Sequence, residues 1–381
     1  MTVQADRFPM AGLCALAVAS FVTILTEALP AGLLSQIGGS MGVSEAMAGQ
    51  WISIYALGSL LAAIPLTSAT RSWRRRPLLL AAVMGFAISN LVTAVTGSFI
   101  VAMVARFVAG VSAGLLWALL AGYAVRMAPP RFGGRAMAVA MAGTPLALSM
   151  GIPAGTFLGI LVGWRLVFGS LSVIALLLIV WIIAKVPDFA GESEAKRPSL
   201  TQVFAVPGVR SVLAVILCFV LAHNLLYTYI APILAGHRMA NQIDSVLLVF
   251  GCSALLSIGL TGVWIDRWLR PLTITAIGLF LAASTIFALT TGAPVAIFGA
   301  ALVWGLAFGG SATVFQTASA RAAGGAADVA QAIIVTAWNL AIFGAGFIGG
   351  FILENVGPWA LPWAGIALLF AAIGSALRMK D

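Results

Sequence analysis

Long apolar runs along this chain are separated by short polar loops. A helix needs about 20 mostly apolar residues to cross the hydrocarbon core of a membrane, and twelve runs come near that length. They cover roughly residues 10–34, 50–69, 77–96, 99–125, 135–160, 165–186, 209–234, 244–264, 271–290, 293–317, 327–352 and 359–377. The pattern therefore predicts an all-α membrane protein with twelve transmembrane helices.

Two connections between these runs are longer than the others. Residues 37–49 are rich in glycine and join the first two predicted spans. Residues 187–208 lie near the midpoint of the chain and combine charged residues with prolines, which is typical of a linker. We expect two six-helix bundles, residues 1–186 and 209–381, joined by a cytoplasmic linker at 187–208.

The lysines and arginines predict the orientation of the chain. If the N-terminus is cytoplasmic, 17 of the 20 basic residues fall on the cytoplasmic side and two fall outside, while Arg106 lies within a span. Such an excess of positive charge is characteristic of cytoplasmic loops. Both termini are therefore expected in the cytoplasm.

The composition agrees with this architecture and excludes a soluble protein. Hydrophobic residues make up 62% of the 381 residues and charged residues 8%, whereas soluble domains carry about 25% charged residues. The net charge of +9 comes from the basic loops, so it does not indicate nucleic-acid binding. We expect a multi-pass protein of the cell (inner) membrane, monomeric in the lipid bilayer.

Two opposite charges fall inside predicted spans. Arg106 lies in the fourth span, and Glu27 is the one acidic residue well inside a span. Each lies about seven residues from the extracytoplasmic surface, which is ~10 Å at 1.5 Å per residue. A charge at that depth is costly unless it faces the bundle interior and finds a partner. We expect the two side chains to lie within reach of each other, directly or through water; a static structural role is the alternative.

Basic clusters follow both the second and the eighth predicted span. Thr70 and Asp266 stand at matching places in the two clusters and are 196 residues apart, close to half the chain. This spacing predicts a duplicated six-helix unit, which is a common architecture of transporters. The loop residues concerned are Arg71, Arg74 and Arg75 in the first copy and Gly262, Asp266, Arg267 and Arg270 in the second.

Small residues indicate where helices pack closely. Gly110 and Gly114 follow Arg106 at four-residue intervals, so the three share roughly one helix face. A second group lies in the fifth span and consists of Gly151, Pro153, Gly155 and Gly159. A hinge or a tight seam is one interpretation of this group, and plain helix packing is the interpretation we favour.

Together these motifs resemble those of the major facilitator superfamily, and within it the twelve-span drug/proton antiporter branch, which includes arabinose-efflux permeases. The similar segments are Arg106 to Gly114, Gly151 to Gly159, Glu27-Ala-Leu-Pro30, Tyr227-Thr-Tyr229 and the two basic loops. The first loop departs from the family pattern at Leu66, Thr70 and Trp73, where Gly, Asp and Gly are expected. The resemblance implies alternating access and a role for Arg106 in proton coupling, with Glu27 as the candidate proton carrier.

A cavity lined by aromatic and amide groups suits a small neutral or lipophilic solute, and Glu27 would also suit a cation. The candidate lining residues near mid-span are Asn90, Trp117, His223, Asn224, Tyr227, Gln316, Trp338 and Asn339. An offset of 196 pairs Glu27 with His223, whereas aligning Pro30 with Pro232 pairs Glu27 with Tyr229, so the register of the repeat stays open. We expect a structural or substrate-contacting role for His223.

The first interpretation is a secondary active transporter that exports a small solute, such as a drug or a sugar, in exchange for protons. Uptake or uncoupled transport of a small metabolite is the alternative. A membrane-embedded enzyme would need clustered carboxylates, metal ligands or an activated nucleophile, and a channel would need rings of polar residues. The sequence contains neither pattern, and it has no nucleotide-binding loop or metal-type Cys/His spacing. No cofactor or metal is expected.

Overall fold

The computed structural model describes residues 8–70, 72–129, 132–191, 207–265, 267–290, 292–323 and 327–379. Every regular element within these ranges is helical. Eleven helical segments are long and apolar enough to cross a membrane, and α18 (Ala360–Ala376) is a shorter apolar helix that makes the twelfth span. The predicted twelve-helix architecture is confirmed. Residues 192–206 of the expected linker lie outside the described ranges, so the predicted domain boundary stays a prediction.

The first six spans make up the N-terminal half. The first span consists of α1 (Met10–Ala28), the 3₁₀ turn η1 (Leu29–Leu33) and α2 (Leu34–Met41). The next four are α3 (Glu45–Ala69), α4 (Arg75–Val95), α5 (Phe99–Met127) and a broken span of α6 (Gly133–Met141), α7 (Gly143–Leu146), the π turn η3 (Ala147–Gly151) and α8 (Ile152–Val162). The sixth is α9 (Trp164–Lys185).

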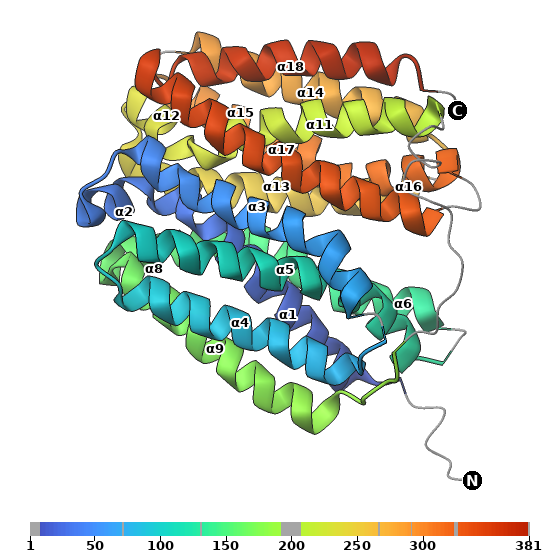
Figure 1. Ribbon diagram of the computed structural model, residues 1–381. Helices are drawn as coiled ribbons and strands as arrows, with labels where there is room; N and C mark the ends of the chain where they lie inside the picture. Colours follow the sequence, from blue (N-terminus) through green and yellow to red (C-terminus); the bar gives the residue numbers. More distant parts are fainter. Residues whose placement is uncertain are drawn as a thin grey trace.

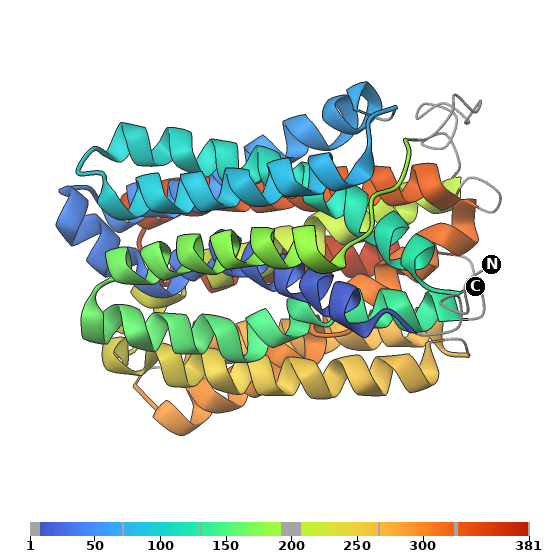
Figure 2. The same ribbon diagram turned by 90° about the horizontal axis from the view of Figure 1, so that it is seen from below.

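The C-terminal half contains the other six spans. They are α11 (Pro207–Thr228) with α12 (Ile230–Gly236), η4 (Ala240–Gln242) with α13 (Ile243–Trp264), α14 (Leu269–Leu289), α15 (Pro294–Phe308) with α16 (Ser311–Ala323), α17 (Ala327–Asn355) and α18. Helices α3 and α17 run side by side where the halves meet (Figure 1). In both views α1 begins and α18 ends at the same end of the molecule (Figures 1 and 2), as two cytoplasmic termini require.

The prediction that residues 37–49 form a long loop is wrong. Helix α2 continues the first span to Met41, and α3 begins at Glu45. Gly42 adopts a left-handed conformation with φ of 67° and ends α2, a position that glycine occupies without steric cost. The glycines of this stretch therefore permit a helix followed by a tight turn.

Prolines account for the breaks within the first, fifth and seventh spans, because proline lacks the N–H that would continue an α-helix. The first span changes from α1 to the 3₁₀ turn η1 around Pro30, and the π turn η3 lies between Pro145 and Pro153. The seventh span breaks in a similar way after Thr228. Thr228 lies 200 residues after Ala28, where α1 ends, so aligning the two breaks pairs Glu27 with Tyr227. This register differs from both registers considered from the sequence.

The same close helix crossing occurs in each half. A Cβ atom added at Gly110 in α5 would lie 1.9 Å from the carbonyl oxygen of Tyr55 in α3, and one at Gly305 in α15 would lie 2.2 Å from the carbonyl oxygen of Phe250 in α13. Gly305 and Phe250 each follow their counterparts by 195 residues. The pairs Gly114–Ser59 and Gly309–Ala254 repeat the relation one turn further along. The duplicated halves therefore share a backbone contact that has no room for a side chain.

The glycines of the fifth span face leucines of the first span. The contacting pairs are Leu25–Gly151, Leu29–Gly155 and Leu33–Gly159. Pro153 lies among them, at the start of α8. These residues pack the first and fifth spans together over the extracytoplasmic half of the N-terminal bundle.

The apolar core shows which side of the molecule is closed. One buried cluster combines residues of both halves, among them Leu29 and Trp51 with Tyr229 and Phe250. A second buried cluster lies toward the cytoplasmic ends of the N-terminal half, and its buried members all come from that half. The halves therefore share a core on the extracytoplasmic side and separate toward the cytoplasm, which is an inward-facing arrangement.

Hydrogen bonds reinforce the extracytoplasmic contact. The Gln50 side-chain amide in α3 donates to the Gly346 carbonyl of α17 at 3.0 Å, and the Tyr229 hydroxyl donates to the same carbonyl at 2.5 Å. Nearer the surface, the Ser44 hydroxyl donates to the Glu354 carboxylate at 2.8 Å. We call the group Gln50, Tyr229 and Gly346 the extracytoplasmic latch.

The glycine crossing predicts a stability difference between two substitutions in one helix. We expect Gly110→Ala to lower the free energy of unfolding by about 1–3 kcal/mol, because the new methyl group would overpack against the Tyr55 carbonyl. Gly122→Ala is the matched control, since no atom lies within 4 Å of a Cβ added there. Thermal unfolding of the purified variants measures the difference, and equal midpoints would contradict it.

The latch predicts a shift between conformations. We expect Gln50→Ala to raise the population of the outward-open state about fivefold, because a hydrogen bond contributes about 1 kcal/mol. Distances between spin labels on α2 and α12 would report the shift. Asn355→Ala is the control at the same end of the molecule, because the Asn355 side chain donates to the Phe351 carbonyl of its own helix. An unchanged distance distribution for Gln50→Ala would count against the latch.

Candidate functional site

A buried arginine links three helices of the N-terminal half. Arg106 in α5 is 0% exposed, and its guanidinium donates from Nη1 to the Thr26 carbonyl at 2.6 Å and from Nη2 to the Asn90 Oδ1 at 2.8 Å. The Asn90 amide in turn donates to the Thr26 hydroxyl at 3.0 Å. The Phe168 ring of α9 lies 4.9 Å from the guanidinium carbon. Together Thr26, Asn90 and Arg106 form a closed ring of hydrogen bonds that we call the arginine ring.

Arg106 forms no ion pair among the described residues, and its Nε atom has no acceptor. Carbonyl and amide oxygens stabilise a guanidinium by their dipoles, but they leave its net charge in place. A buried charge in this condition favours an anion at any accessible position nearby.

Glu27 directly follows Thr26, which binds Arg106, so Glu27 and the Arg106 guanidinium lie at about the same depth in the membrane. The Glu27 carboxylate accepts no hydrogen bond within the described structure and the residue is partly exposed. The Tyr55 hydroxyl lies within electrostatic range of both Glu27 and Arg106, and it donates to the Thr23 carbonyl at 3.2 Å. The two charges thus lie near one tyrosine without direct contact, and a water-bridged contact between them stays a prediction.

Aromatic side chains surround His223 in the C-terminal half. Its Nδ1 accepts a hydrogen bond from the Trp304 indole of α15 at 3.1 Å, and its ring stacks on Phe308 at a centroid distance of 3.4 Å. Tyr227 lies one turn along α11, 5.2 Å from the His223 ring. The Tyr227 hydroxyl is buried without a hydrogen bond and lies within electrostatic range of Glu27. Through Tyr227, this aromatic group therefore interacts electrostatically with Glu27 of the other half.

The remaining cavity candidates have simpler surroundings. The side-chain amides of Asn224 and Asn339 each donate to a carbonyl four residues back in their own helix, which leaves their oxygens as acceptors. The Trp338 ring lies 6.1 Å from that of Phe308. Trp117 is partly buried against the cytoplasmic core of the N-terminal half, and Gln316 is exposed. Of this group, Trp338 contacts the aromatic residues around His223 through Phe308.

The cytoplasmic loop after α3 is held by the start of the linker. Asp188 forms an ion pair with Arg74 and accepts a hydrogen bond from the backbone N–H of Arg76, in the first turn of α4, at 3.0 Å. The backbone N–H of Arg75 donates to the Phe189 carbonyl at 2.9 Å. Thr70 stands where the family pattern has aspartate, and its hydroxyl donates to Leu66 in its own helix. The acidic side chain that binds this basic loop is therefore that of Asp188, which lies 118 residues after Thr70 in the sequence.

The second basic loop is described in part. Arg71 of the first loop and Asp266 of the second lie outside the described residues. The Arg267 guanidinium lies 5.6 Å from the Trp268 ring, and Arg270 donates to the Leu377 carbonyl at 3.0 Å. Gly262 has open space around its Cα. The bond from Arg270 ties the loop to the residue that follows α18.

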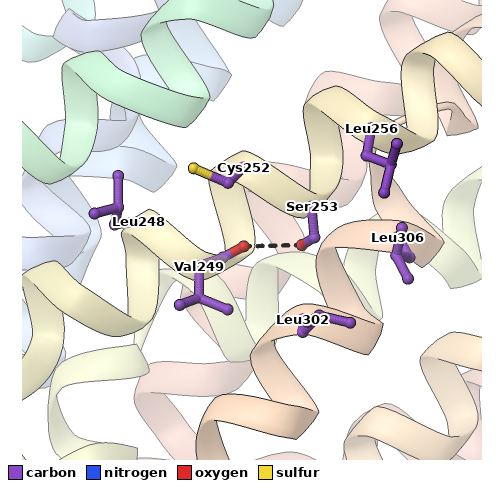
Figure 3. Close-up of a pocket in the computed structure, with 7 residues that line it drawn as sticks. All are labelled: Leu248, Val249, Cys252, Ser253, Leu256, Leu302 and Leu306. Carbon is purple, nitrogen blue, oxygen red and sulfur yellow. Dashed lines mark hydrogen bonds between the residues drawn. The ribbon is translucent and has the colours of Figure 1, made fainter.

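A hollow on the outer surface of the C-terminal half lies apart from these polar groups. It measures about 430 Å³ and is lined by Leu248, Val249, Cys252, Ser253, Leu256, Leu302 and Leu306 of α13 and α15 (Figure 3). Its single hydroxyl, Ser253, donates to the Val249 carbonyl of its own helix (Figure 3). An apolar lining on exposed helix faces fits contact with lipid tails, so this hollow is not the solute site.

Several residues of the site escaped the sequence-based reasoning. Thr26 and Tyr55 contribute a carbonyl and a hydroxyl that no motif marks, and Trp304 was not among the candidates. The estimated depth of Glu27 and Arg106 could have indicated these residues, because any polar group at the same depth was a possible partner of Arg106. Asn90 was expected to line the cavity, whereas its side chain is committed to Arg106 and Thr26.

The sequence and the fold are both similar to those of known membrane transporters. The family profile described as Major Facilitator Superfamily matches residues 16–346. The purine ribonucleoside efflux pumps NepI of Shigella dysenteriae serotype 1 (strain Sd197) and of Escherichia coli (strain K12) are each 29% identical to this chain over 362 residues, covering 94% of it and 91% of their own length. A bacterial homologue of the human lysosomal transporter Spinster, solved in an inward-facing and occupied conformation, has the same fold, with a TM-score of 0.69 at 16% identity over 96% of this chain and 93% of that one.

The Asp188 contacts predict a pH-dependent contribution to stability. The Arg76 backbone hydrogen bond, with the Arg74 side chain, lowers the pKa of the Asp188 carboxyl below its usual value. Because the folded pKa is depressed, the stabilisation is present above the unfolded value of about 3.9 and is lost as pH falls through the folded value. We expect Asp188→Asn to lower the unfolding temperature at pH 7 and to make little difference at the lowest pH that the protein tolerates. Thermal unfolding of both proteins across this range is the measurement, and a pH-independent difference would contradict the assignment.

Proposed function

We propose that this chain, which belongs to the Major Facilitator Superfamily of membrane transporters, exports a ribonucleoside-like solute in exchange for protons. Membership of this family makes the protein a multi-pass transporter of small molecules and not an enzyme. The direction, the coupling ion and the solute are the parts that we propose. The observation that carries the proposal is that, within the described structure, the Glu27 carboxylate forms no hydrogen bond and directly follows Thr26, whose carbonyl binds a buried arginine that has no ion-pair partner there.

Proton coupling is supported by the division of roles between the two charged residues. The arginine ring occupies Nη1 and Nη2 of Arg106, so its guanidinium holds α1, α4 and α5 together. Among the described residues the Glu27 carboxylate has no hydrogen-bond partner, and Glu27 is partly exposed, so it can gain or lose a proton without breaking the ring. A carboxylate in this position meets the geometric requirement for a proton carrier.

The nature of the solute is inferred from the relatives and from the aromatic groups of the C-terminal half. The related NepI pumps are named for purine ribonucleoside efflux. Phe308 and Trp338 are partly exposed and provide flat surfaces beside His223, and flat heterocycles stack on such rings. Amide oxygens of Asn224 and Asn339 and the Tyr227 hydroxyl supply hydrogen bonds for a neutral polar solute. A ribonucleoside combines these features, so we prefer it to the drug or sugar expected from the sequence.

The proposed cycle starts from the inward-facing state. Glu27 releases its proton to the cytoplasmic side and the solute enters between the halves. The halves then rock about the central site as the latch opens and the cytoplasmic ends close. On the extracytoplasmic side the solute leaves and Glu27 takes up a proton, which returns the protein to the inward-facing state. One proton thus moves inward as one solute molecule moves outward.

The coupling step is tested with Glu27→Gln, which keeps the size of the side chain but cannot lose a proton. In inside-out vesicles with an acidic interior, we expect the variant to accumulate radiolabelled adenosine at least about 10-fold more slowly than the wild type, because a positioned proton-transfer group contributes about 10²–10⁴-fold. Collapse of the pH gradient should slow the wild type to the same low level.

Glu45→Gln is the matched control, because Glu45 is an acid of the same half at the extracytoplasmic start of α3 and bonds to Ser35. It should keep gradient-driven accumulation. Gradient-driven accumulation by Glu27→Gln would remove Glu27 from the role. Transport by the wild type that ignores the gradient would favour uncoupled transport instead.

A further inference from the structure

His223 and Tyr227 are neighbouring side chains of α11, and each carries a polar atom that forms no hydrogen bond within the described structure. His223 is 5% exposed and Tyr227 is 4% exposed. They lie four residues apart and therefore on one helix face. Within the described structure, neither the His223 Nε2 nor the Tyr227 hydroxyl takes part in a hydrogen bond. The Tyr227 hydroxyl is fully buried, and buried polar groups are rarely left unpaired, so this hydroxyl calls for an explanation.

The hydrogen bond from Trp304 determines the proton position on His223. An indole N–H can only donate, so the Nδ1 atom that receives it must carry a lone pair. The imidazole is therefore neutral, and its proton lies on Nε2. This leaves an N–H donor at the opposite edge of the ring.

Stacked rings also fix the direction of this donor. Phe308 lies against one face of the His223 ring with an interplanar angle of 7°. The Tyr227 and Phe250 rings lie 5.2 and 5.8 Å away at angles of 27° and 29°. An imidazole held by a hydrogen bond and by aromatic packing cannot turn to find another acceptor. Its Nε2–H is thus a preoriented donor for a group that enters from outside the protein.

Tyr227 is placed differently, because its hydroxyl lies within electrostatic range of Glu27 in the other half. Alignment of the helix breaks also puts Glu27 and Tyr227 at equivalent positions of the two halves. A carboxylate accepts and a phenol both donates and accepts, so the pair can hold a hydroxyl group between them. His223, one turn away, offers only a donor.

We infer that these groups fix the orientation of a bound ribonucleoside: the His223 Nε2–H donates to a ring nitrogen of the purine base, and Tyr227 with Glu27 binds a ribose hydroxyl. The inference rests on the proposed function and adds to it the atoms that recognise each part of the solute. Because one solute molecule would contact both halves, its binding to the C-terminal half would also change the surroundings of the Glu27 carboxylate.

The test compares how well adenosine analogues inhibit transport of radiolabelled adenosine into inside-out vesicles. The analogues are 1-deazaadenosine, 3-deazaadenosine and 7-deazaadenosine, which each lack one acceptor nitrogen of the ring, and 2′-deoxyadenosine and 3′-deoxyadenosine, which each lack one ribose hydroxyl. For the wild type we expect one deaza and one deoxy analogue to inhibit about 10-fold more weakly than adenosine, because each loses one hydrogen bond to a buried group.

Two variants should lose these preferences separately. The double variant His223→Phe with Trp304→Phe removes both partners of the internal hydrogen bond while keeping aromatic rings, and it should lose the deaza preference but retain the deoxy preference. Tyr227→Phe should lose the deoxy preference but retain the deaza preference. His223→Gln should retain the deaza preference, because its amide oxygen can accept from Trp304 while its N–H donates to the base.

Each outcome separates the inference from the function on which it rests. If the wild type does not transport adenosine, both the proposed function and this inference are overturned. If it transports adenosine but all five analogues inhibit as well as adenosine does, only the inference is overturned. Loss of both preferences in either aromatic variant, or loss of the deaza preference in His223→Gln, would also overturn the orientation.

Discussion

The contact of one buried guanidinium with a backbone carbonyl determines the arrangement of the N-terminal half. Arg106 binds the carbonyl of Thr26, three residues before the first span breaks into the 3₁₀ turn. A carbonyl near a helix break has lost regular partners further along the chain, and a cation is a strong donor for it. Because Asn90 completes the ring, three helices are fixed at one level, and Glu27 is left unbonded beside them. The proposed chemistry depends on that unbonded carboxylate.

The C-terminal half repeats the backbone of the N-terminal half without repeating its polar chemistry. The glycine crossings coincide at an offset of 195 residues, and at that offset Ala301 stands in the place of Arg106. The C-terminal half instead contains the aromatic group around His223. One half therefore carries charge and the other carries flat surfaces, and the solute is proposed to bind where the two meet.

Much of the architecture was predictable from the sequence, because hydrocarbon imposes its own length and polarity on every span. The twelve spans, their orientation and the small-residue segments follow from that constraint. The partners of Arg106 could not be predicted, because counting residues along a helix gives the depth of a side chain in the membrane but not its direction. Pairing of His223 with Trp304 joins helices 81 residues apart, which no local pattern reveals. Asp188 falls within the linker predicted at residues 187–208, and its bond to the first turn of α4 becomes apparent only in the structure.

The separation of the cytoplasmic core from the rest has a consequence for evolution. The buried members of that core all come from the N-terminal half, so substitutions within the C-terminal bundle need not disturb it. Under the proposed function, mutations around Trp304 and Phe308 would then alter the contacts with the base while the surroundings of Glu27 stay intact. Related exporters would then change the base that they recognise through substitutions in one bundle, whereas a hybrid that exchanges whole bundles would have to preserve the extracytoplasmic core that both halves share.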